Sequence, residues 1–158
     1  ADEIERLQIR VNPYEYYYAG MNYRGPFSSV GATLMSTPYC LAVACVDKEV
    51  TFKGISQFTN RKILAVIDRI EHVPDQNIPR WSCIVDVQMK NGKKFRKEMI
   101  IGPEYYNFNL KQDIELVKRV TSETGVNQSK VDRMIEVIRN FEKEKNVKKL
   151  VEVLAHCP

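Results

Sequence analysis

Tyr39 is the residue at which the sequence most clearly suggests chemistry. It directly follows Pro38, within residues 25–46, which carry no charged side chain. Because proline removes a backbone donor, we expect the helix ladder to be interrupted here and the phenol to be directed out of the core. A phenol placed in this way can deliver or hold a proton. The alternative is a core tyrosine with a satisfied hydroxyl.

A buried helix is expected to position this tyrosine. Residues 28–47 contain apolar side chains at the three- to four-residue spacing of one helix face, namely Val30, Leu34, Leu41, Ala44 and Cys45. Pro38 lies in the middle of this run. We therefore predict one buried helix over residues 28–47 that bends at the proline.

Strands are expected on both sides of this helix in the sequence. Residues 4–11 alternate between polar and apolar side chains, with Leu7, Ile9 and Val11 facing the core. Residues 70–73 form a second strand, which Pro74 ends. Two further strands flank Asn91 and Gly92. Their apolar faces coincide only if the loop has three residues with Gly92 in the left-handed conformation, so a bulged hairpin is predicted.

Short polar signals mark the remaining helices. Asn60 begins a helix before the second strand, and Asn109 with Gln112 predicts a capping box. Asn127 and Asn146 begin the last two helices. Residues 12–31 are predicted to form a structured loop, whose tyrosines either pack against a neighbouring domain or contact a ligand; we favour the first. The predicted fold is α+β, with a mainly antiparallel four-stranded sheet covered by the buried helix and the C-terminal helices.

Length and composition are those of one folded domain spanning residues 1–158. The chain is 44% hydrophobic and 28% charged. It has no run of eighteen apolar residues and no signal-peptide pattern, so we expect a cytoplasmic protein without a membrane span. The cysteines, at positions 40, 45, 83 and 157, make no CxxC pair and are expected to be buried, reduced thiols.

The net charge is modest and evenly spread. A formal charge of +4 arises from 24 basic and 20 acidic residues, without a basic stripe. Nucleic acid is therefore a poor candidate partner. A small positive balance is compatible with steering a di- or tricarboxylate toward a site, although a solvated lysine-rich surface explains most of these residues.

Several familiar catalytic patterns are missing from the sequence. It contains no paired Ser/His/Asp set, no phosphate loop and no Cys/His cluster with metal-ligand spacing. Of its two histidines, His72 is a weak candidate because nothing near it in sequence would orient its ring. We therefore expect that this chain does not hold a complete active site.

The sequence around Tyr39 resembles the C-terminal domain of the MmgE/PrpD family. That family carries a helix similar to Q-A-x-F-S-x-P-Y-A-x-A-x-x-L-x-D-G, and the matching residues here are Ser36, Pro38, Tyr39, Ala42 and Asp47. Further short matches follow in the family's order: Arg24-Gly-Pro-Phe before the helix, then Gln57-Phe-Thr, Val73-Pro-Asp, Asn91-Gly and Asn107-Phe-Asn-Leu.

The resemblance implies a function as well as a fold. Members include 2-methylcitrate dehydratase, an enzyme of propionate metabolism, cis-aconitate decarboxylase and iminodisuccinate epimerase. In these metal-independent lyases and isomerases, the domain resembled here closes as a lid over a large helical N-terminal domain, which this chain lacks. The resemblance implies no cofactor, a small di- or tricarboxylate as substrate and a homodimeric enzyme.

The resemblance also assigns roles to three residues. Tyr39 matches the lid tyrosine and is the expected catalytic residue, while Ser36 would bind substrate or the phenol and Arg24 would pair with a substrate carboxylate. The alternatives are a core tyrosine, a serine bonded back to its helix and a surface arginine. Leu34 and Lys48 depart from the family pattern and leave the substrate open. The competing function is a free-standing small-molecule-binding or protein-interaction domain without catalysis.

Overall fold

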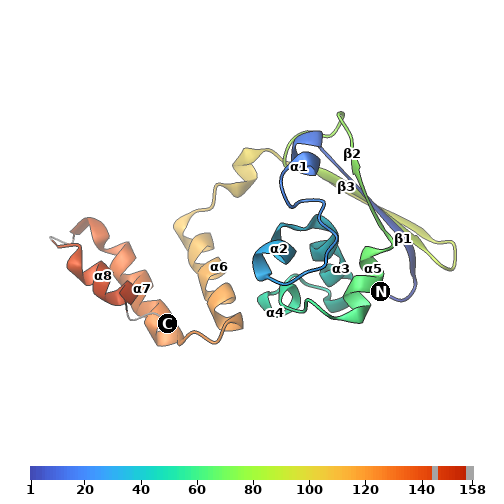
Figure 1. Cartoon of the computed structure of the whole chain (residues 1–158). Coiled ribbons are helices and arrows are strands. Elements are labelled where there is room, and N and C mark those ends of the chain that lie inside the picture. The colour runs from blue at the N-terminus through green and yellow to red at the C-terminus, as the bar shows by residue number, and fades with distance from the viewer. Residues whose placement is uncertain (144–145, 156–158) are drawn as a thin grey trace. The chain divides into compact units, whose positions relative to one another are not determined.

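The computed structural model describes residues 1–143 and 146–155 and confirms the α+β fold (Figure 1). The chain divides into two compact units, Ala1–Asn107 and Phe108–Pro158. The first unit contains the sheet and all three residues with predicted roles. The assignment of the whole chain to a single domain stays a prediction.

The first unit is built on a four-stranded mixed sheet of order β2-β1-β3-β4. The strands are β1 (Ile4–Val11), β2 (Ile70–Pro74), β3 (Cys83–Met89) and β4 (Lys94–Met99). β1 pairs in parallel with β2 and antiparallel with β3, and β3 pairs antiparallel with β4. Two of the three pairings are antiparallel, as the sequence predicts.

The hairpin of β3 and β4 has the predicted bulged loop. Gly92 has a φ of 81°, and its N–H donates to the Met89 carbonyl at 2.9 Å. This loop places Val87 opposite Phe95 and Asp86 opposite Arg96. Each apolar residue therefore lies opposite an apolar residue, and the acidic residue lies opposite a basic one. A left-handed residue at this position explains why the chain uses glycine.

Five short helices accompany the sheet in the first unit. They are α1 (Pro13–Tyr17), α2 (Val30–Met35), α3 (Thr37–Asp47), α4 (Phe52–Ile55) and α5 (Arg61–Ile67). Helices α2 to α5 lie together on one side of the sheet (Figure 1). The expectation that residues 12–31 hold no regular element is wrong, because Asn12 caps α1 and Pro13 occupies its first turn.

The prediction of a single proline-bent helix over residues 28–47 is also wrong. The chain leaves the helical conformation at Ser36, which ends α2 and caps α3. Pro38 then lies in the first turn of α3, where a backbone N–H would have no partner within the helix. The proline therefore helps to start a helix instead of bending one.

The core of the first unit lies between β1, β2 and the helices α3 and α5. Its buried residues include Leu7, Ile9, Val11, Tyr39, Val43, Ile63 and Ile70. The predicted inward face of the first strand is confirmed. Cys40, Cys45 and Cys83 are free thiols but only half-buried, and Cys157 lies outside the described residues.

The second unit is helical. It contains α6 (Leu110–Glu123), α7 (Gln128–Arg139) and α8 (Lys148–Ala155), with a short 3-10 turn at Phe141–Lys143; another 3-10 turn, Pro103–Tyr106, lies in the first unit. The capping box of Asn109 and Gln112 is present, and Asn127 caps α7 as predicted. Covering of the sheet by these helices stays a prediction.

Lys48 offers a simple test of local strain at the end of α3. It caps the helix with a φ of 70°, the left-handed conformation that glycine adopts without cost. We expect Lys48→Gly to raise the free energy of unfolding by about 0.5–1 kcal/mol in urea denaturation. Lys48→Ala is the matched control, because it removes the charge but keeps the β-carbon; an equal gain in both variants would contradict this explanation.

Candidate functional site

Tyr39 is buried in the first turn of α3. Its side chain has no exposed surface, and its ring packs edge-to-face against Phe27 with centroids 4.6 Å apart. The hydroxyl donates to the Gly54 carbonyl of α4 at 3.4 Å, which is long for a hydroxyl donor. The expectation that the phenol points out of the core is therefore wrong for this unit by itself.

The surroundings of Tyr39 favour the protonated phenol. Burial raises its pKa above the ordinary value of 10, and the neighbouring Cys40 and Asp47 add to this rise. A phenol with a raised pKa keeps its proton at neutral pH. In chemical terms, the residue is suited to donating a proton or a hydrogen bond and unsuited to acting as a base.

Ser36 and Arg24 both make hydrogen bonds to backbone groups of the first unit. The buried Ser36 hydroxyl accepts from the Tyr39 N–H at 3.1 Å and donates to the Tyr23 carbonyl at 2.5 Å. Arg24 donates through Nη2 to the carbonyls of Ile67 and Ile70, at 2.5 and 2.9 Å. Ser36 thus links the loop before α2 to α3, and Arg24 links that loop to the end of α5 and the start of β2.

The structure adds Gly54 to the surroundings of Tyr39. A β-carbon at this position would lie 2.6 Å from Cγ1 of Val43, so α4 approaches α3 closely only because residue 54 is glycine. Thr51 caps α4 by accepting from the Gly54 N–H at 3.0 Å. The capping threonine is the signal in the sequence that could have revealed α4.

His72 is another residue whose environment the sequence does not reveal. It is buried on the core side of β2, with its ring 4.9 Å from that of Tyr16, and neither ring nitrogen has a hydrogen-bond partner. Burial, together with the charge of Arg24, lowers its pKa from 6.5 to about 4. The ring is therefore neutral at physiological pH.

The lowered pKa of His72 predicts a loss of stability in acid. The unfolded chain takes up this proton near pH 6.5 and the folded chain only near pH 4. The contribution of His72 to the free energy of unfolding is therefore constant above pH 6.5 and falls between these two values. Between pH 7 and 4.5 we expect a loss of roughly 2–3 kcal/mol from this residue. Urea denaturation of wild type and His72→Phe at both pH values measures it, and an equal acid loss in the two proteins would contradict it.

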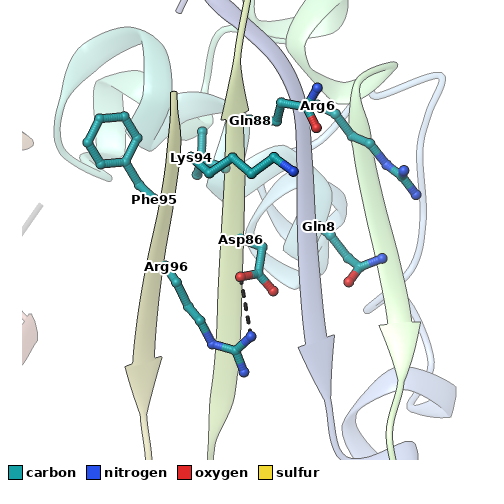
Figure 2. A pocket seen from close by; sticks show the side chains of 8 residues that line it. Arg6, Gln8, Asp86, Gln88, Lys94, Phe95 and Arg96 are labelled. Atoms are coloured by element: carbon teal, nitrogen blue, oxygen red, sulfur yellow. Dashed lines mark ion pairs between the residues drawn. The ribbon is translucent and has the colours of Figure 1, made fainter. Parts of the chain in front are cut away.

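The face of the sheet opposite the core carries a polar hollow of about 350 Å³ (Figure 2). Figure 2 shows Arg6, Gln8, Asp86, Gln88 and Arg96 on this face, with the ion pair between Arg96 and Asp86 at 3.6 Å. Arg6 pairs with Glu71, and Arg10 pairs with Asp86 at 3.0 Å. Arg6, Arg10 and Arg96 have acidic partners, and Lys94 adds a further positive charge to the lining of the hollow (Figure 2).

Within residues 1–143 and 146–155, no three His, Cys, Asp or Glu side chains gather as metal ligands. None of the helices there has the length and apolar character needed to cross a bilayer. No protein-family model matches the chain, and no curated protein gives a significant match.

Proposed function

We propose that this chain is the C-terminal domain of a metal-independent lyase or isomerase of the MmgE/PrpD type. In this proposal the enzyme acts on a di- or tricarboxylate, and the chain closes the active site of a helical domain. A cytoplasmic, homodimeric enzyme is part of the same proposal. No cofactor takes part in it.

One observation carries the proposal: separate stretches of the family resemblance meet around α3. Ser36 caps the helix that bears Tyr39. At the other end of α3, Asp47 accepts a hydrogen bond from Nε2 of Gln57 at 3.0 Å. Both partners of this bond belong to the resemblance, although they are ten residues apart in the sequence. The matched residues therefore form one framework that supports the tyrosine.

The proposed chemistry is proton transfer at the carbon next to a substrate carboxylate. A protonated phenol can donate to the substrate or stabilise the charge that develops on it, whereas a separate base must remove the proton. The base is assigned to the helical domain. Tyr39 is buried here, so substrate access requires that its long hydrogen bond to Gly54 be exchanged for one to the substrate.

The roles of Ser36 and Arg24 are narrower in this proposal than the resemblance implies. Both side chains already hold backbone groups of the first unit. We propose that they position Tyr39 and its loop, and that direct contact of Ser36 or Arg24 with substrate would require these bonds to be replaced.

The alternative function, a binding or interaction domain without catalysis, has one specific observation in its favour. The side chains of Tyr14, Tyr17, Tyr18 and Trp81 are exposed on the first unit. Aromatic residues of this kind are enriched in protein interfaces. The same surface also suits packing against a helical domain, so the two functions must be separated by activity.

The test is turnover by the chain alone and by the full-length protein of which it is proposed to be a part. We expect the chain alone to be inactive on 2-methylcitrate, citrate, cis-aconitate and iminodisuccinate, because the proposal assigns the base to the helical domain. The full-length protein should turn over at least one of them, with the same rate before and after treatment with EDTA. Turnover by the chain alone, or inhibition by EDTA, would contradict the proposal.

A further inference from the structure

A small aromatic pocket lies between α1 and the turn at Arg80 and Trp81. It encloses about 330 Å³ and is lined by the rings of Tyr14, Tyr18 and Trp81 and by two methionines, Met21 and Met35. Glu15 and Arg80 are the charged residues in its lining. Aromatic faces beside one carboxylate are the features that bind organic cations in proteins.

Arg80 already behaves as a cation bound to this pocket. Its guanidinium carbon lies 3.9 Å from the centroid of the Tyr14 ring and 5.2 Å from that of Trp81. Its Nε is 3.6 Å from Oε1 of Glu15, an ion pair that is too long for a hydrogen bond. The Arg80 side chain is 49% exposed, so it can turn into solvent without crossing the core.

Glu15 is poorly satisfied by these contacts. Its side chain is only 18% exposed, and Oε2 is buried without a hydrogen-bond partner. The N–H of Trp81 reaches Oε1 at 3.5 Å, a weak contact. A buried carboxylate oxygen without a donor carries an energetic cost that a better-placed N–H group would remove.

Trp81 holds its ring in the pocket at the cost of backbone strain. Its φ is 68°, a value that side chains other than those of glycine, asparagine and aspartate rarely adopt. Tyr106 packs on the same ring with centroids 5.7 Å apart. Strain maintained by surrounding contacts is often associated with binding sites.

We propose that this pocket binds an alkylguanidinium cation, such as an arginine side chain or a free small molecule, and that Arg80 is its exchangeable internal ligand. The single negative charge of Glu15 balances one cation. An incoming guanidinium therefore replaces Arg80, stacks on Tyr14 and Trp81, and donates to the unsatisfied oxygen of Glu15. This site is separate from the proposed role of Tyr39.

Trp81 is the only tryptophan of the chain, so its fluorescence reports on this pocket directly. The probes are butylguanidinium and its uncharged analogue butylurea, at concentrations that do not lower the melting temperature. We expect Arg80→Ala to bind butylguanidinium about tenfold more tightly than wild type, because the internal competitor is gone. Arg61→Ala, on the exposed start of α5, is the matched control and should bind as wild type does.

The charge requirement is tested by a second substitution. Arg80→Ala combined with Glu15→Gln should lose the added affinity, and butylurea should bind none of the variants. If Arg80→Ala does not fold, Arg80→Gln keeps most of the stem and replaces it. A short arginine-containing peptide that binds Arg80→Ala more tightly than butylguanidinium supports a protein ligand, while equal or weaker peptide binding supports a free small molecule.

Three results would overturn the proposal. The first is equal affinity of wild type and Arg80→Ala for butylguanidinium. The second is equal binding of butylurea and butylguanidinium. The third is quenching of wild type by citrate that disappears in Arg80→Ala, which would make Arg80 an anion-binding residue.

Discussion

Replacing Tyr39 by phenylalanine in the full-length protein is expected to lower kcat by about 10²- to 10⁴-fold, if the hydroxyl donates in the proton-transfer step. The fold should hardly change. The ring contact with Phe27 is kept, and the lost bond to Gly54 is 3.4 Å long, so its removal costs about 1 kcal/mol or less. Activity and stability are therefore separable at this position.

Steady-state kinetics beside a thermal melt make this measurement. Tyr16→Phe is the matched control, since it removes a hydroxyl that accepts from Nδ2 of Asn22 at 3.0 Å and has no proposed chemical role. We expect Tyr16→Phe to retain kcat. A folded Tyr39→Phe variant with unchanged kcat would make Tyr39 a core residue only.

The largest effect on stability is expected for Ile63→Ala in α5. Ile63 has no exposed surface and belongs to the core of the first unit. Truncation of a fully buried isoleucine removes apolar contacts and leaves a cavity, which costs about 2–5 kcal/mol. The midpoint of urea denaturation should fall accordingly.

Ile100→Ala is the matched control for this substitution. Ile100 lies in the same unit but is 56% exposed, so the same change in side chain should cost less than about 1 kcal/mol. Equal losses in the two variants would contradict the assignment of the core to the side of the sheet where α5 packs.

Features set by neighbours in the sequence could be predicted. The alternation in residues 4–11 identifies β1, and the need for matching faces identifies the loop at Gly92. The capping box at Asn109 is equally local. Each of these depends on a few adjacent residues whose side-chain chemistry leaves one favourable arrangement.

The break between α2 and α3 is also encoded locally, although the predicted single helix does not include it. A serine two residues before a proline is typical of a helix start, with Ser36 as the cap and Pro38 in the first turn. The hydrophobic periodicity on both sides of Ser36 concealed this signal, because two short buried helices can share the spacing of one long helix.

The burial of Tyr39 and the pocket at Arg80 could not be predicted in the same way. Tyr39 is covered partly by α4, whose position depends on the close approach of Gly54 to Val43. Glu15 and Arg80 are 65 residues apart and meet only because α1 and the turn after β2 fold together. Such contacts depend on tertiary packing, which short sequence patterns do not specify.

The most direct test of the proposed function is solvent deuterium incorporation by the full-length protein, followed by ¹H NMR in D₂O. Dehydration in its reverse direction, decarboxylation and epimerisation all deliver a solvent proton to a carbon next to a carboxylate, so one measurement covers the three reactions. We predict deuterium at that carbon for at least one of 2-methylcitrate, citrate, cis-aconitate and iminodisuccinate, and strong suppression by Tyr39→Phe. Neither exchange nor turnover with any of the four would contradict the proposal.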